Sequence, residues 1–212
     1  METGISMTQS LDVPRLSERE QDPVEGQERE WIRASQSGNT AAFNHLVLKW
    51  ERPIYNLALR MMQQPAEAEE VTQEVFFSAY RSIKRFRQDA RFSTWLYRIA
   101  SNKCLTRLRQ RPRRSHWSLD DLDTPILDTQ QLSQSAGQED HLLRQEQRDV
   151  VLQALQALAA EQRLVVELKF YQDLKFEEIA EALDIPTSTA KSRFYTSLEI
   201  LKKRLSRLGE PT

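Results

Sequence analysis

The residues that could do chemistry gather in one stretch, residues 80–114, where aromatic and basic side chains alternate. Between residues 81 and 114 there are twelve basic residues and one acidic residue, a net charge of +11. Basic side chains on a helix follow a phosphate backbone, and aromatic rings stack on unpaired bases with about 1–3 kcal/mol per base. The pattern predicts an interface for single-stranded or opened DNA. For any single ring, such as Phe86, Phe92 or Trp95, a plain core position is the alternative.

A second candidate site lies at residues 176–205, where two short stretches of helical spacing flank a turn at Asp184. Two such helices joined by a three- or four-residue turn form a helix-turn-helix, and the start of the second helix then enters the major groove of DNA. Residues 186–208 carry a net charge of +5, which favours DNA binding over an ordinary helical hairpin. The predicted DNA-facing residues are Ser188, Thr189, Lys191, Ser192, Arg193, Tyr195 and Thr196.

An acidic face is expected on the helix that runs from Pro65 to about Phe86. Glu67, Glu70 and Glu74 share this face, opposite the apolar stripe. DNA would repel such a surface, so that any partner would be a basic protein. The alternative is a solvent-exposed acidic face without a partner.

The elements that must position these residues are all helical. Five glycines in 212 residues are about 2.4%, against a typical ~7%, which argues against barrels and sandwiches. The predicted fold is all-α, with two small helical domains joined by a flexible acidic linker and the helix-turn-helix in the second. Pro53 is expected to kink or divide its helix. The expected boundaries are a disordered tail at 1–26, the first domain at 27–111, the linker at 112–142 and the second domain at 143–208.

Composition excludes several other classes of protein. One cysteine and three scattered histidines predict no internal disulfide, no metal centre and no nucleophile–base pair, so a helical enzyme is disfavoured. Glycine-rich phosphate loops do not occur in the sequence, and no cofactor is predicted. An acidic N-terminus without an apolar stretch is not typical of a signal peptide, and no apolar run is long enough to span a membrane. The expectation is a soluble cytoplasmic protein.

Two blocks of the sequence resemble a known family. PAEAEEVTQEVFFSAYRSIKRF and RFSTWLYRIASNKCLTRLRQ resemble region two of the extracytoplasmic-function (ECF) class of bacterial RNA polymerase sigma factors. QRLVVELKFYQDLKFEEIAEALDIPTSTAKSRFYTSLEILKKRL resembles region four of the same class. The resemblance covers residues 27–111 and 143–205 in the family's order. This sequence differs from the family pattern at Asp184, where the family often has Gly, and at Thr196, where the family often has a basic residue.

The resemblance implies a role for each block. Core polymerase, through the clamp helices of its largest subunit, would bind Glu70, Gln73, Glu74 and Phe77. The minus-ten promoter element would be captured and opened by Arg85, Phe86, Arg87, Phe92, Trp95, Arg98, Asn102, Lys103 and Arg107. The helix from Thr189 would read the minus-thirty-five element, and the acidic linker would thread toward the polymerase active-site cleft.

The function implied is that of a transcription initiation factor without catalysis, an alternative sigma factor for a stress or envelope response. Its partners would be core RNA polymerase (clamp helices and flap), promoter DNA and an anti-sigma factor. A stand-alone helix-turn-helix regulator is the competing hypothesis, and it predicts a dimer on a palindromic site. It leaves the acidic helix and the basic-aromatic block unexplained.

Overall fold

The computed structural model describes residues 23–87, 90–110, 151 and 153–208, and every regular element within them is a helix. The expected all-α class is therefore confirmed for this part of the chain. The predicted linker at 112–142 and residues 1–22 of the predicted tail lie outside the described residues. The elements are α1 (Pro23–Gln36), α2 (Thr40–Met62), α3 (Pro65–Ser82), the 3-10 turn η1 (Ile83–Arg85), α4 (Phe92–Gln110), α6 (Ala160–Phe170), α7 (Phe176–Leu183) and α8 (Thr187–Leu208).

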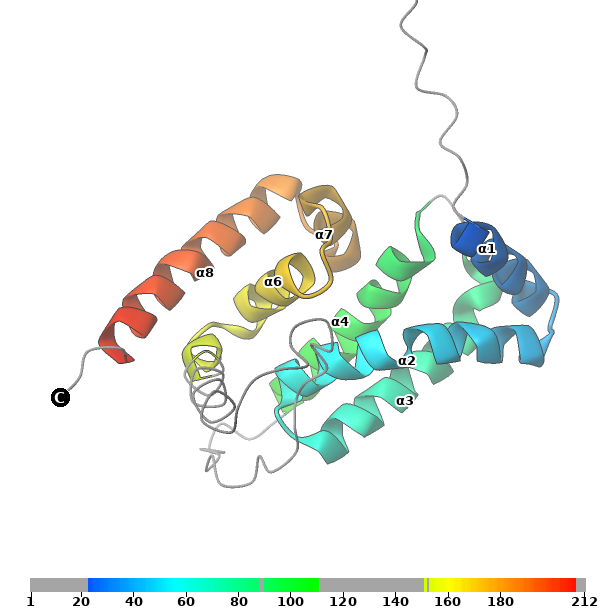
Figure 1. Ribbon diagram of the computed structural model, residues 1–212, viewed down its shortest axis with the longest axis horizontal. Coiled ribbons are helices and arrows are strands. Elements are labelled where there is room, and N and C mark those ends of the chain that lie inside the picture. Colours follow the sequence, from blue (N-terminus) through cyan, green and yellow to red (C-terminus); the bar gives the residue numbers. More distant parts are fainter. Residues whose placement is uncertain (1–22, 88–89, 111–150, 152, 209–212) are drawn as a thin grey trace, which may run out of the picture.

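The first group of helices packs around α2, which contacts α1, α3 and α4 (Figure 1). Local sequence explains where these helices begin. Gly38 takes a positive φ of 94° in the turn, and the Asn39 side chain then caps α2 by accepting a hydrogen bond from the Ala42 N–H at 3.1 Å. Pro65 opens α3, where its missing N–H costs nothing. α1 begins at Pro23, so the last four residues of the predicted tail are helical.

α2 runs through Pro53 as one continuous helix. Of the two outcomes expected at Pro53, a kink or a division of the helix, the division does not occur. The residues that follow it explain why, because Ile54, Leu57 and Ala58 are fully buried and hold the second half of α2 against the core. Burial of such side chains outweighs the loss of one backbone hydrogen bond.

The second group consists of α6, α7 and α8, which contact one another. α7 ends at Leu183 because Asp184 adopts the left-handed conformation, with φ 55° and ψ 48°. The Ile185 N–H then donates to the Ala180 carbonyl at 3.0 Å and closes the turn. α7, this turn and α8 form the predicted helix-turn-helix.

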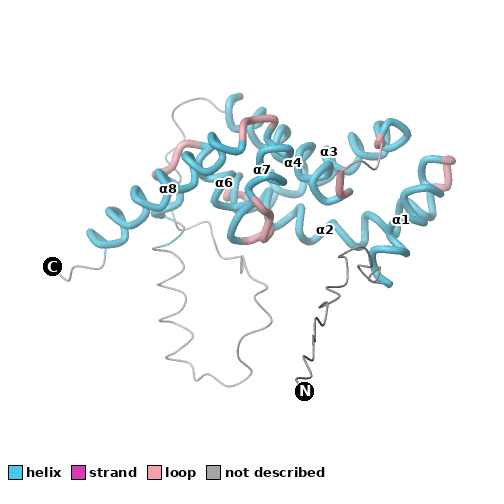
Figure 2. Tube along the Cα trace, turned by 90° about the horizontal axis from the view of Figure 1, so that it is seen from above, coloured by secondary structure: helices cyan, strands magenta, loops and turns pink. Residues whose placement is uncertain are grey.

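The two groups of helices lie directly against each other (Figures 1 and 2). α7 contacts α4, and α6 contacts both α2 and α4. Buried apolar residues form a single cluster that includes Leu57 from the first group and Leu164 and Ile179 from the second. The sequence predicted two tethered domains and did not predict this interface.

Candidate nucleic-acid interface

Three aromatic side chains pack together where η1 leads into α4. The ring centroid of Trp95 lies 5.0 Å from that of Phe86 and 5.4 Å from that of Phe92. Phe86 and Phe92 are only 7% and 4% exposed, whereas Trp95 is half-buried. Trp95 is therefore the ring of the three that remains accessible to a partner, and the two buried phenylalanines pack against it.

The segment that carries these rings is fixed by a residue that sequence reasoning missed. The Gln36 side-chain amide, at the end of α1, donates to the Ile83 carbonyl at 3.1 Å and to the Phe86 carbonyl at 2.7 Å. These bonds tie η1 to α1 and leave Arg85 and Arg87 exposed on the outside. A glutamine at a helix end is too common to have signalled this role.

A basic face continues along α4 beyond Trp95. The Arg98 side chain is 46% exposed, those of Lys103 and Arg107 are about one-third exposed, and Asn102 is exposed. An open groove of ≈ 560 Å³ runs between this face and α3, lined by Glu74, Ile99, Asn102, Lys103, Thr106, Arg107 and Gln110. Of the predicted minus-ten residues of α4, the structure thus brings Asn102, Lys103 and Arg107 together in one groove, whereas Phe92 is buried.

Glu70 and Glu74 of α3 form ion pairs with basic residues that line this groove. The Lys103 ammonium lies 3.3 Å from the Glu74 carboxylate, and the Arg107 guanidinium pairs with Glu70 and, at 3.7 Å, with Glu74. Two residues predicted to bind polymerase are therefore ion-paired with two residues predicted to bind DNA. From the sequence we expected the acidic face to bind a protein and the basic face to bind DNA, and we did not predict contact between the two.

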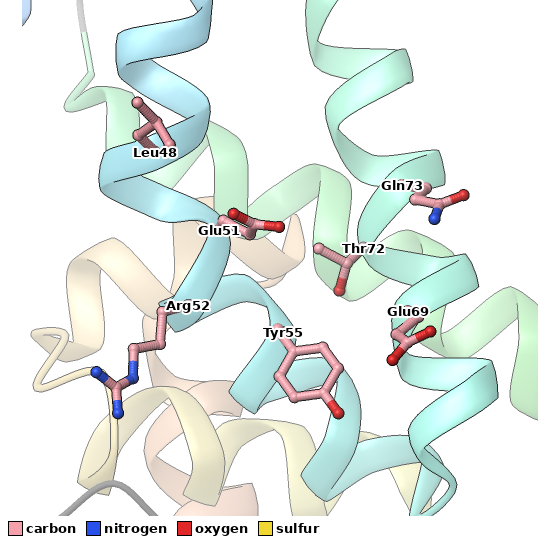
Figure 3. A pocket seen from close by; sticks show the side chains of 7 residues that line it. All are labelled: Leu48, Glu51, Arg52, Tyr55, Glu69, Thr72 and Gln73. Atoms are coloured by element: carbon pink, nitrogen blue, oxygen red, sulfur yellow. The ribbon is translucent and has the colours of Figure 1, made fainter.

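The other two predicted polymerase-binding residues, Gln73 and Phe77, are also exposed on α3. Gln73 lines a groove between α2 and α3, where Tyr55 and Glu69 lie on facing helices (Figure 3). Burial raises the pKa of the Tyr55 hydroxyl, with a smaller contribution from the Glu69 carboxylate. Phe77 is 61% exposed, and the Arg81 guanidinium carbon lies 5.6 Å from its ring centroid. An exposed phenylalanine suits a protein partner better than DNA.

The recognition helix α8 presents its first turns to solvent. Ala190 and Phe194 are buried against the rest of the helix-turn-helix. The predicted minus-thirty-five residues that are exposed are Ser188, Lys191, Ser192, Tyr195 and Thr196, while Thr189 and Arg193 are half-buried. The exposed set falls at helical spacing on one side of α8, which is the arrangement that major-groove contact requires.

Aromatic packing fixes the start of α8 against its neighbours. The Phe176 ring centroid lies 5.4 Å from that of Phe194 and 6.3 Å from that of Tyr195. Phe170, at the end of α6, packs on Phe194 at 5.5 Å and is itself 60% exposed. Helical periodicity predicted Phe194 as core but gave no role to Phe170, which lies in the helix before the motif.

Comparisons with known proteins match both blocks. The family described as Sigma-70 region 2 matches residues 46–114, and the family described as Sigma-70, region 4 matches residues 148–201. The RNA polymerase sigma-H factor of Pseudomonas aeruginosa is 34% identical over 188 residues, which cover 86% of this chain and 95% of that protein. The ECF sigma factor SigW of Bacillus subtilis is 33% identical, covering 82% of this chain and 94% of that protein.

Solved structures show the same fold. CnrH, in complex with the cytosolic domain of CnrY, has a TM-score of 0.64 at 21% identity and matches 85% of this chain and 98% of its own. The sigma factor RpoE of Bartonella quintana, in complex with the anti-sigma factor NepR, has a TM-score of 0.57 at 21% identity, covering 77% and 96%.

The chain belongs to the ECF class of RNA polymerase sigma factors. It is an alternative sigma factor for transcription initiation, in a family that binds core RNA polymerase and promoter DNA. None of its described helices has the length and apolar character needed to cross a membrane. Within the same residues, no three His, Cys, Asp or Glu side chains gather as metal ligands would.

Proposed function

We propose that this sigma factor opens the minus-ten element with the α4 face around Trp95 and reads the minus-thirty-five element with the first turns of α8. The observation that carries the proposal is the half-buried Trp95 beside a run of exposed basic side chains on one helix. Extruding a base from the stack costs a few kcal/mol, and stacking on one aromatic ring returns about 1–3 kcal/mol. Trp95 is therefore sufficient to offset most of the cost of one flipped base.

Phe86 and Phe92 act as positioning residues in this proposal. Their burial keeps them from stacking on a base, and their packing fixes the plane of Trp95 instead. The half-exposed Arg98 then holds a phosphate next to the captured base, together with Asn102. Arg85 and Arg87 lie on the outer side of the loop, where they attract the strand electrostatically.

Core polymerase binds the outer side of α3, on which Gln73 and Phe77 are exposed. An exposed aromatic side chain with polar residues near it is the kind of surface that a partner protein buries. Glu70 and Glu74 add negative charge at the edge of that surface, although both are already engaged by α4.

The chain performs no catalysis of its own and acts in the cytoplasm, where polymerase and promoters are. It is held inactive by an anti-sigma factor, as the similar Bartonella quintana structure is a complex with one. The class implies a stress or envelope response as the setting. The helix-turn-helix and the basic α4 face together support a subunit with two separate promoter contacts.

The experiment is reconstitution of transcription. Overproducing the chain in its host and mapping new transcript 5′ ends gives both promoter elements, which are then tested with purified core polymerase. We expect Trp95→Ala to reduce promoter opening more than promoter binding, and Lys191→Ala to reduce binding to the minus-thirty-five element. Arg33→Ala, an exposed arginine of α1, is the matched control.

A tight and specific complex between the purified chain and promoter duplex, formed without polymerase, would overturn the proposal in favour of a stand-alone regulator. Equal effects of Trp95→Ala on binding and on opening would overturn the assignment of that ring.

A further inference from the structure

The last residue of α1 holds both ends of the turn that leads to the ring cluster of Phe86, Phe92 and Trp95. The Gln36 side-chain nitrogen donates to the Ile83 carbonyl at 3.1 Å and to the Phe86 carbonyl at 2.7 Å. These two carbonyls belong to the first residue of η1 and to the residue that follows its end. Because an amide nitrogen carries two hydrogens, one side chain satisfies both acceptors. A single residue of another helix therefore fixes the two ends of η1 relative to each other.

α1 is firmly anchored at the end that carries Gln36. Ile32 and Ser35 are each only 3% exposed, and the Ser35 hydroxyl donates to the Trp31 carbonyl at 2.6 Å. The turn that follows is closed by a hydrogen bond from the Gly38 N–H to the Ser35 carbonyl at 3.0 Å. Side chains whose own position is fixed in this way hold the residues of a functional site accurately. Gln36 thus acts on η1 from a rigid support.

The backbone that Gln36 holds carries a ring that packs against Trp95. The ring centroid of Phe86 lies 5.0 Å from that of Trp95 and 5.8 Å from that of Phe92. Phe86 is 7% exposed, and side chains in such a close-packed environment cannot shift without moving their neighbours. A displacement of the Phe86 backbone is therefore passed on to the plane of Trp95.

The same helix also supports the second phenylalanine, through Trp50 of α2. The Trp50 indole N–H donates to the Glu28 carboxylate of α1 at 2.6 Å, and the Trp50 ring centroid lies 6.5 Å from that of Phe92. The Phe92 ring in turn lies 5.4 Å from that of Trp95. α1 is thus linked to the ring cluster from two sides, directly at Phe86 and through Trp50 at Phe92.

The similarity to region 2 gives Gln36 no role. The residues matched to that region begin at 46, and α1 ends at Gln36. Its amide nitrogen is bound to two backbone carbonyls, so any effect of Gln36 on DNA acts through η1 and the rings and not through direct contact.

We propose that Gln36 is a positioning residue for base capture: its amide fixes η1 so that Phe86 holds Trp95 in the orientation in which the ring stacks on the flipped base. The inference rests on the proposed function of Trp95. A ring that is fixed before the base arrives loses little freedom on binding, which is why its positioning strengthens capture. The first encounter with the closed duplex depends on phosphate contacts and does not require that orientation.

The test uses holoenzyme reconstituted from core polymerase and full-length variants on the mapped promoter. Gln36→Met removes the donor with little change in size. Gln36→Asn keeps the amide on a side chain one methylene shorter, which cannot span both carbonyls, and it takes the place of Gln36→Met if that variant does not fold. Gln27→Met and Gln27→Asn make the same changes at an exposed position of α1 and are the matched controls.

Three readouts separate positioning from folding. Fluorescence anisotropy at low temperature measures binding of the closed duplex, and permanganate reactivity of unpaired thymines measures opening. Circular dichroism verifies that each variant retains its helices.

We expect each Gln36 variant to lower promoter opening by about 3- to 10-fold, the range that one ordinary hydrogen bond supplies, and to leave closed-duplex binding unchanged. The Gln27 variants should match the wild type in both. Gln36→Met/Trp95→Ala should open the promoter as poorly as Trp95→Ala alone, because Gln36 acts only through that ring, whereas independent effects would add.

Unchanged opening in the Gln36 variants would overturn the inference, and so would equal losses of binding and opening, which indicate a purely structural role. A double variant that opens the promoter less than Trp95→Ala does would overturn it as well. These results leave the proposed function intact. If Trp95→Ala itself opens the promoter as well as the wild type, the proposed role of that ring fails, and the inference fails with it.

Discussion

Replacing Arg60 with methionine should make the stability of this sigma factor strongly dependent on pH. The substitution keeps an apolar stem but removes the guanidinium group, which pairs with the Glu167 carboxylate of α6. Among the described contacts it leaves the Glu167 carboxylate, 3% exposed, with a hydrogen bond from the Gln172 amide at 3.3 Å. Breaking a buried pair in this way costs about 3–5 kcal/mol, because an uncompensated charge remains inside.

Protonation of Glu167 sets a ceiling on that cost. Burial already raises the pKa of the Glu167 carboxyl, although the Arg60 hydrogen bonds and charge oppose this. Without Arg60 the pKa rises further. Neutralising a glutamate at pH 7 from an unfolded pKa of about 4.3 costs about 4 kcal/mol, at ~1.36 kcal/mol per pH unit. The loss of stability at pH 7 should therefore be about 3–4 kcal/mol.

The sign of the pH dependence follows from the raised pKa. A carboxyl group whose folded pKa exceeds its unfolded value stabilises the fold below the unfolded pKa, and this contribution is lost as the pH rises through the folded pKa. Arg60→Met should lie closest to the wild type near pH 5 and furthest from it near pH 7.5.

The other titratable groups that face Glu167 stay protonated across this range. Burial raises the pKa of Cys104 to about 12, and it also raises the pKa values of Tyr97 and Tyr171. A difference in the loss of stability between pH 5 and pH 7.5 is therefore assigned to Glu167.

Urea unfolding of the variant and the wild type at pH 5 and pH 7.5 measures this effect, with helicity as the signal. Arg60→Met/Glu167→Leu is the matched control, since replacing the whole pair with apolar side chains is often neutral or stabilising. It should remove the pH dependence. An equal loss of stability at both pH values, or no loss at pH 7.5, would refute the reasoning about the buried charge.

Three further predictions concern single residues. Trp95→Ala should lower promoter opening, measured by permanganate footprinting, by roughly 5- to 150-fold, equivalent to about 1–3 kcal/mol of stacking. Trp95→Phe should retain most of the opening activity. Equal losses of opening in the two variants would show that Trp95 does not capture a base. Cys104 is buried and its pKa is raised. It should therefore react with a disulfide reagent at least about a thousandfold more slowly in the native chain than in urea. Rapid labelling of the native chain would contradict the packing of α4. Asp184→Gly should leave the free energy of unfolding unchanged or raised, and Asp184→Val should lower it by about 1–2 kcal/mol, because residue 184 has a φ of 55°. Similar melting temperatures for the two variants would contradict the turn geometry.

Local signals predicted most of the individual elements. Residues 176–183 form α7 with the boundaries that their spacing indicated, and Asp184 takes the left-handed turn that glycine often provides. α3 begins at Pro65 as expected but ends at Ser82, where η1 takes over. Caps, prolines and apolar periodicity act within a few residues, so one sequence is enough to read them.

The interface between the two helical groups was not predictable in the same way. Glu167 stands in an apolar run, Leu164–Val166 before it and Leu168 after it, and a charge in such a position indicates a buried partner. Nothing local identifies that partner, because Arg60 is 107 residues away in the sequence. Pairing over such a separation is decided by tertiary packing, which one sequence does not encode at any fixed spacing.

The ion pairs between α3 and α4 change how the charge pattern of this chain should be interpreted. Glu74→Arg would have been a natural test of polymerase binding, but it would also place a positive charge beside Lys103 and Arg107. Any loss of transcription could then come from polymerase or from a disturbed DNA face. Phe77 is 61% exposed and pairs with no basic residue of α4 among the described contacts. Because its truncation leaves the α3–α4 ion pairs in place, Phe77→Ala separates polymerase binding from DNA opening where a charge reversal at Glu74 cannot.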